Sequence, residues 1–433
     1  MLFDRKELCA GVHLNILSTE KFKRNYVCVN FIIPHKFEYA ARSSLLGEVL
    51  TRGTRLHPTL RDIERELDEC YSAQLAAYSN LRGEAKIITL SMDSLADNYA
   101  LDGESIFGRS CDLLREILFD TLLCDGIFSA EYVESEKTKL IAAVARRKNS
   151  KRHYALDTAK RKMCEGEPYG IPSYGSEEEI ERIDAASLYD FYRFLIDNAA
   201  VELFYVGGES TEKVEGVFLH MFGDRPRDSY APQRCPDVKC ASESRYFSED
   251  ADYKQSVLVM GYRTMINAHS EDKYAFTLFN SIFGSGVNSK LFKVVREKMH
   301  LCYYASCAPE LTKGVAFISS GIDSSNEHVT TEAIKEQLEE VKRGHFTDED
   351  ISDCKKALRN MYNELYDSPD GLCGWYLGRV MFGDTEDIES VCANIQAVER
   401  EQIISVAKKM QLDTVFMLRG ISKAAAGGGA DDE

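Results

Sequence analysis

The sequence predicts an α+β fold built from two similar domains, each a mostly antiparallel sheet with helices packed on one face. Three observations support this prediction. The chain has 433 residues, which is too many for one hydrophobic core. Runs of apolar, β-branched residues alternate with amphipathic, helix-like runs. The order of these runs in the first half occurs again in the second half, which indicates an internal duplication.

The first half opens with two strand-like runs, at residues 11–17 and 26–34, and the second run is the more apolar. A helix is expected from about residue 42 to 52. Another is expected from about 59 to 70, where Thr59 gives a capping start. The next expected elements of the first half are strands at 72–79 and 85–91 and a mostly helical region at 111–159 with a break at 124–128. Two more helices and a closing strand at 201–206 follow.

The second half repeats this order. The clearest internal similarity is between two runs, Phe128-Ser129-Ala130-Glu131 and Phe346-Thr347-Asp348-Glu349, each at the start of an expected helix. The expected elements of the second half are a strand at 255–260, a helix that ends at residue 283, a helix at 290–299, and strands at 315–321 and 413–418.

Changes in composition along the chain suggest where its domains begin and end. We expect an N-terminal domain at residues 1–222 and a C-terminal domain at 253–421. The segment 223–252 between them is polar and rich in proline, as linkers are. Residues 422–433 are rich in alanine and glycine and then acidic, so a disordered tail is expected.

The net charge of −17 comes from 70 acidic and 53 basic residues. This balance argues against a nucleic-acid partner, which would need a basic face. The 13 cysteines are scattered and form no CxxC pair, which is typical of reduced thiols in a cytosolic protein. No apolar run approaches the ~20 residues that cross a bilayer. We therefore expect a soluble, cytoplasmic protein with no membrane partner.

The segment 283–305 carries the clearest functional signal. A turn broken by Gly284 and Gly286 leads into an amphipathic helix and then into an aromatic strand start. Arg296 and Tyr303 lie seven residues apart across that junction, so a guanidinium and a phenol could face the same space. These two groups are suited to holding a peptide carbonyl or carboxylate.

The pattern G-x-x-S-x-L-F-x-x-x-R-E-x-x-x-L-x-Y, which starts at Gly286, resembles the C-terminal half of the pitrilysin/insulinase metallopeptidases, the inverzincins. Lys290 and His300 depart from the residues common in that family. The resemblance implies two domains in a clam shape with the substrate between them. It also implies that Arg296 and Tyr303 bind the substrate backbone beside the zinc.

The first half of that family carries H-x-x-E-H on a helix, usually followed by Gly-Thr. Two histidines four residues apart reach one zinc ion, and the glutamate activates the water on the metal. In this sequence the Gly-Thr pair that follows the motif corresponds to Gly53-Thr54. Counting back from it, the resemblance places Ser44, Gly47 and Glu48 at the His, Glu and His positions.

The family's third ligand is a glutamate that follows another glutamate by seven residues. If Glu136 is the earlier one, Ala143 stands at the ligand position, although Glu131 and Glu134 leave that alignment open. No two of the nine histidines lie within five residues of each other, so the chain has no H-x-x-E-H anywhere. We expect no catalytic residue, no metal and no cofactor in this chain.

Three functions are consistent with this pattern. The resemblance first implies a catalytically silent subunit, in which Arg296 and Tyr303 contribute peptide binding to a partner chain that carries H-x-x-E-H and the zinc. A non-proteolytic scaffold or chaperone-like protein of the same fold is the alternative, and burial of the two side chains in plain packing would favour it. A lone peptidase with another metal site is a third, but the sequence has no ligand cluster for it.

Overall fold

The computed structural model describes residues 3–223, 227 and 236–421, and these form two compact units. Unit 1 holds the described residues of 1–145, 171–234 and 364–387. Unit 2 holds those of 146–170, 235–363 and 388–433. Each unit therefore includes a segment from the opposite half of the sequence, which the predicted domain boundaries did not contain.

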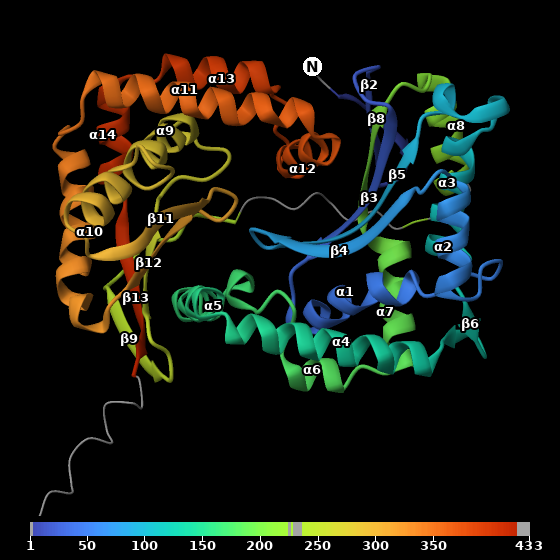
Figure 1. Cartoon of the computed structure of the whole chain (residues 1–433), viewed down its shortest axis with the longest axis horizontal. Coiled ribbons are helices and arrows are strands. Elements are labelled where there is room, and N and C mark those ends of the chain that lie inside the picture. Colours follow the sequence, from blue (N-terminus) through green and yellow to red (C-terminus); the bar gives the residue numbers. More distant parts are fainter. Residues whose placement is uncertain (1–2, 224–226, 228–235, 422–433) are drawn as a thin grey trace, which may run out of the picture. The chain divides into compact units, whose positions relative to one another are not determined.

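Unit 1 is organised on a six-stranded sheet with the order β1-β2-β8-β3-β5-β4 (Figure 1). Neighbouring strands are antiparallel except β2 and β8, which are parallel. The strands are β1 (Asp4–Cys9), β2 (Val12–Ser18), β3 (Arg24–Pro34), β4 (Gln74–Arg82), β5 (Ala85–Leu95) and β8 (Ala200–Gly207).

Unit 2 has a five-stranded sheet with the order β11-β12-β10-β13-β9, antiparallel except for the parallel pair β13 and β9. Unit 1 shows the same order from β4 to β2, with its parallel pair at the same place. This correspondence supports the predicted duplication, and the predicted α+β class is confirmed. The strands are β9 (Arg245–Ala251), β10 (Ser256–Arg263), β11 (Cys302–Glu310), β12 (Val315–Ile322) and β13 (Gln411–Gly420).

Strand β9 lies in the segment predicted as a linker. Its side chains are mostly exposed, as expected of a strand at the edge of a sheet, so its polar composition concealed it in the sequence. Part of that segment and the predicted disordered tail at 422–433 lie outside the described residues.

One face of each sheet carries the main helical layer. Alternate residues of β3 (Val27, Val29, Phe31 and Ile33) belong to the buried core under the helices of unit 1. The helix of residues 59–70 is confirmed, and a capping box joins Thr59 to Asp62. The helices that contribute to this core are α1 (Phe37–Leu50), α2 (Leu60–Glu69), α3 (Ile106–Phe119), α4 (Ala130–Asn149), α6 (Glu177–Glu181), α7 (Ala185–Asn198) and α8 (Thr211–Phe222), and the last residues of α4 belong to unit 2.

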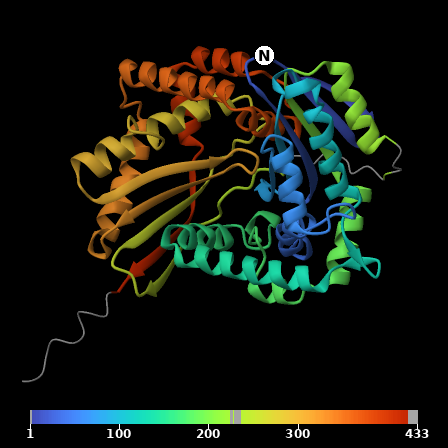
Figure 2. The same cartoon turned by 45° about the vertical axis from the view of Figure 1, so that its right-hand side comes forward.

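The helices that unit 2 takes from the second half of the sequence appear in yellow to red in Figure 2. In α9, the rings of Phe276, Phe279 and Phe283 follow one another at 5.6 and 5.5 Å between centroids and are buried. The helices are α9 (Lys273–Phe283), α10 (Glu327–Lys342), α11 (Asp348–Glu364), α13 (Ile388–Ala397) and α14 (Arg400–Lys408).

Besides this layer, each sheet is packed by one helix that comes from the opposite half of the sequence, and we call these two the exchanged helices. In unit 1, α12 (Pro369–Val380) places the ring of Tyr376 4.8 Å from that of Phe3 and 6.2 Å from that of Phe204. In unit 2, α5 (Lys151–Met163) packs against β10 and β13. The continuous apolar run of β3, buried along nearly its whole length, is typical of a strand covered on both faces.

A cluster of buried charges fixes the segment after α5 to the sheet of unit 2. Arg263 donates to Glu167 (Nη2 to Oε1, 2.8 Å) and to Asp413 (Nε to Oδ2, 3.0 Å). The ammonium of Lys313 lies 2.5 Å from Glu167 Oε2. All four side chains are nearly inaccessible to solvent, so each charge depends on its partners in the cluster.

This cluster predicts a loss of stability in acid. Burial alone would raise the pKa of Glu167, but hydrogen bonds from Arg263 and Lys313 outweigh it and lower the pKa from 4.5 to about 2. The stabilisation is fully present above pH 4.5 and should disappear as the pH falls through about 2. Urea unfolding across the acid range should show this loss. The Glu167→Gln variant should show a shallower pH dependence, and an unchanged slope would contradict the assignment.

Candidate functional site

Arg296 lies on a π-helix, η4 (Leu291–Lys298), where an ordinary α-helix was predicted. The N–H of Met299 bonds to the carbonyl of Val294 at 2.9 Å, five residues back. Leu291 and Val295 are buried and fix the helix to the core of unit 2. The wider turn leaves the Arg296 side chain 39% exposed, and such turns are frequent at functional sites.

The guanidinium of Arg296 is held by its own helix. It stacks 4.6 Å from the ring centroid of Phe292, and its Nε lies 3.5 Å from Glu297 Oε1. The planar group keeps donor positions that a carbonyl or carboxylate of a ligand can use.

Tyr303 stands at an irregularity in β11. Cys302 pairs with Ile322 and Tyr304 pairs with Gly321, so Tyr303 is an extra residue opposite two consecutive residues of β12. Such a bulge redirects a side chain, and Tyr303 is 58% exposed. It is not part of the core packing of unit 2.

The structure brings both predicted residues to one pocket of about 360 Å³ in unit 2. The rest of its lining was not predicted. Hydrogen bonds from Ser325 lower the pKa of the exposed Asp323 carboxyl, so it is ionised at neutral pH. The pocket therefore offers donors for a carbonyl and acceptors for an N–H. Its lining residues are Arg296, Glu297, His300, Leu301, Cys302, Tyr303, Asp323 and Asn326.

The degenerate zinc-motif residues lie on α1, which packs against β4 and β5 of unit 1. Ser44 is half-buried and donates to the carbonyl of Ala40 at 3.1 Å. Gly47 is buried against β4, where an added Cβ would lie 3.1 Å from the Cβ of Ala77. Glu48, one turn after Ser44, is exposed. The helix therefore has one ionisable side chain at the three motif positions.

These residues do not fit a zinc ion. A serine hydroxyl is a poor neutral ligand, Gly47 has no side chain, and Ala143 is exposed on α4 without a donor atom. The surroundings shield part of the Glu48 carboxyl from water although the side chain is exposed, and this partial desolvation, with the nearby Glu136 carboxylate, raises the pKa of Glu48. No group of three His, Cys, Asp or Glu side chains within residues 3–223, 227 and 236–421 could hold a metal. No step of a reaction is therefore assigned to a metal in this chain.

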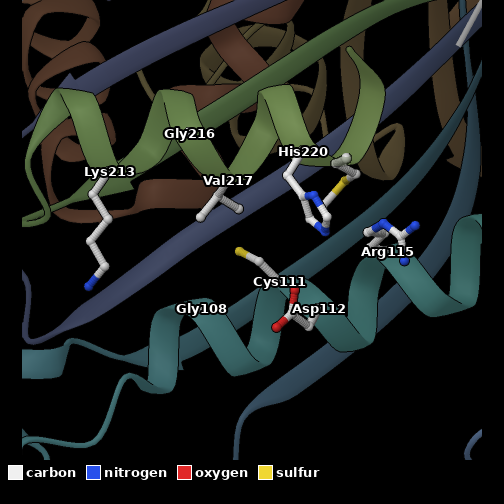
Figure 3. Close-up of a pocket in the computed structure, with 9 residues that line it drawn as sticks. Gly108, Cys111, Asp112, Arg115, Lys213, Gly216, Val217 and His220 are labelled. Atoms are coloured by element: carbon white, nitrogen blue, oxygen red, sulfur yellow. The ribbon is translucent and has the colours of Figure 1, made fainter. Parts of the chain in front are cut away.

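A second pocket, of about 340 Å³, lies between α3 and α8 of unit 1 (Figure 3). The side chains of Arg115 and His220 lie at one end of it, and Lys213 lies at the other. The Lys213 ammonium is already bound to Asp97 and Glu209, at 2.5 and 2.8 Å. Burial raises the pKa of the Cys111 thiol well above its usual value, which keeps it protonated and unreactive. No sequence pattern indicated this pocket.

In the part of the chain that the structure describes, no helix is both long and apolar enough to span a membrane.

Comparison with known proteins identifies relatives over nearly the whole chain. The family described as "Peptidase M16 inactive domain" matches residues 182–358. The "Probable inactive metalloprotease YmfF" of Bacillus subtilis is 30% identical over 416 residues, which cover 96% of this chain and 97% of that protein.

Two solved structures are similar in fold. A conserved protein from Enterococcus faecalis has a TM-score of 0.90 at 27% identity and covers 98% of this chain and 100% of its own. A peptidase M16 inactive domain from Pseudomonas fluorescens has a TM-score of 0.80 at 17% identity, with coverage of 97% and 98%.

Proposed function

Because the chain belongs to the M16 peptidase family, we propose that it is the non-catalytic subunit of a two-chain zinc peptidase. The observation that carries this proposal is a contrast between the units. The described residues of unit 1 offer no donor set for zinc, whereas unit 2 presents Arg296 and Tyr303 together in an open pocket. Such a subunit would bind the peptide, while the partner chain would supply the metal and the glutamate that activates water.

The pocket of unit 2 is proposed to bind the backbone of an extended peptide. The Arg296 guanidinium and the Tyr303 hydroxyl would donate to a peptide carbonyl. Asp323 would accept from a peptide N–H. These contacts involve only the main chain and leave the sequence of the peptide open.

A second peptide contact is proposed on unit 1. Strand β4 is the last strand of its sheet, and the hydroxyl of its Ser79 lies 3.2 Å from that of Ser44. An edge strand has backbone N–H and C=O groups that an extended peptide can pair with. Pairing at β4 would run the peptide past the α1 residues that correspond to the motif.

The first test of this proposal is purification from the native cell. We expect a second chain of similar size that bears H-x-x-E-H to co-purify. The pair should cleave unstructured peptides and lose that activity with a chelator, while this chain alone should be inactive. Stoichiometric zinc and chelator-sensitive cleavage in the isolated chain would contradict the proposal.

A non-proteolytic scaffold of the same fold is the second candidate, because a relative is described as inactive. In that case the native complex would contain no chain with H-x-x-E-H, and the complex would not cleave peptides. The exposure of Tyr303 weighs against a role for it in plain packing.

A further inference from the structure

We propose that fixed side-chain cations now occupy the corner of unit 1 that corresponds to the metal site, so that restoring the metal ligands alone would not restore zinc binding. Lys86 lies at the first ligand position, and Arg52 lies beside Glu136. This inference goes beyond the proposed function, because it concerns the isolated chain and needs no partner.

Lys86 is the first of the two cations. It lies on β5 and is 0% exposed, although the strand around it is apolar. Its ammonium donates to the carbonyl of Ser173 at 2.7 Å and to the hydroxyl of Ser44 at 3.5 Å. The ring centroid of Tyr174 lies 5.9 Å away. A lysine is rarely buried this completely, and a buried ammonium must keep its hydrogen bonds. The Lys86 side chain is therefore held in place beside Ser44.

A histidine at position 44 would have to share this space. Its ring would extend from the same Cβ that carries the hydroxyl, toward the ammonium now 3.5 Å from that oxygen. A zinc ion bound to the ring would then lie close to a buried positive charge, and like charges in a poorly solvated corner repel strongly. Lys86 therefore opposes a metal ion by charge as well as by volume.

Arg52 is the second cation. Glu136 on α4 is 2% exposed, and its Oε1 lies 3.1 Å from Nη1 of Arg52 and 2.8 Å from Nζ of Lys139. The Arg52 guanidinium also lies 4.8 Å from the ring centroid of Tyr132. A buried carboxylate needs a positive partner, and here the side chains of Arg52 and Lys139 provide it without a metal.

Two readings of the site therefore make different predictions. If only the ligands have been lost, then replacing them should restore zinc binding. If the two cations have taken over the site, the replaced ligands should fail to bind zinc until both Lys86 and Arg52 are removed. Gly47 is left unchanged in the test, because its position supplies no ligand and an added side chain would press on Ala77.

The experiment compares three variants of the full chain. The first carries Ser44→His, Glu48→His and Ala143→Glu. The second adds Lys86→Met and Arg52→Met to the first. The control instead adds Lys21→Met and Arg65→Met, at two exposed positions of unit 1. Zinc per chain is measured by mass spectrometry after dialysis, with circular dichroism as the check of folding. We expect near-stoichiometric zinc only in the second variant, with an affinity at least about tenfold above the other two. Equal zinc binding by all three, or by none while folded, would overturn the proposal.

A second measurement needs no restored ligands. Ser44→Asp places a carboxylate next to the Lys86 ammonium, so it should raise the Tm of the natural chain. In a Lys86→Met background the same change would leave a half-buried carboxylate without that cation, and the Tm should fall. The same direction of change in both backgrounds would show that Lys86 does not control this corner.

Discussion

Replacing Arg296 with alanine should reduce peptide cleavage by the assembled pair by about 10- to 100-fold, the value of one or two hydrogen bonds to a charged group. The guanidinium lies in an open pocket and is stacked on Phe292, so its loss removes ligand contacts and little packing. Tyr303→Phe removes only a hydroxyl and should cost up to about tenfold. Steady-state cleavage of a fluorogenic peptide measures both effects.

Lys298→Ala is the matched control. This lysine lies on the same π-helix, is exposed, and does not line the pocket. Its removal should leave cleavage unchanged. A loss of activity equal to that of Arg296→Ala would mean that the helix contributes only its overall charge. Dissociation of the pair on gel filtration would assign Arg296 to assembly and not to peptide binding.

Replacing Arg263 with alanine should lower the free energy of unfolding by about 3–5 kcal/mol, as expected when one partner of a buried charge cluster is removed. Arg263 is 4% exposed and bonds to both Glu167 and Asp413, which would stay buried without it. Urea unfolding followed by circular dichroism measures the change.

An exposed ion pair in the same unit provides the comparison. Arg343 lies 2.9 Å from Glu336, and its side chain is 52% exposed. Arg343→Ala should leave the free energy of unfolding nearly unchanged, because solvent screens the charges of an exposed ion pair. Similar losses in the two variants would mean that the cluster around Arg263 contributes no more than a surface ion pair.

Much of the fold could be predicted from local patterns. Apolar runs placed β3, β5 and β8 correctly, and the capping residues at Thr59 located the start of α2. The family resemblance drawn from the segment 283–305 is confirmed. The exchange of α5 and α12 between the units could not be predicted, because amphipathic periodicity shows that a helix has a buried face and not which sheet covers it.

The candidate site was predicted in part. Spacing and motif indicated Arg296 and Tyr303, and the structure places both in one pocket, while their role stays a prediction. The bulge at Tyr303 depends on the pairing of β11 with β12, which local preference does not contain. The π-helix differs from an α-helix only in the spacing of its local hydrogen bonds, and the apolar periodicity of eight residues does not distinguish the two. Lys86 was missed, although a lysine inside an apolar strand is the signal that could have revealed it.

The placement of α12 has a consequence for how such a chain can be divided. This helix comes from the second half of the sequence, yet its Tyr376 covers Phe3 and Phe204, which come from the first half. A fragment that ends before the second repeat would expose those rings to water. The first half expressed alone would therefore carry an apolar surface that only a helix supplied from elsewhere could cover.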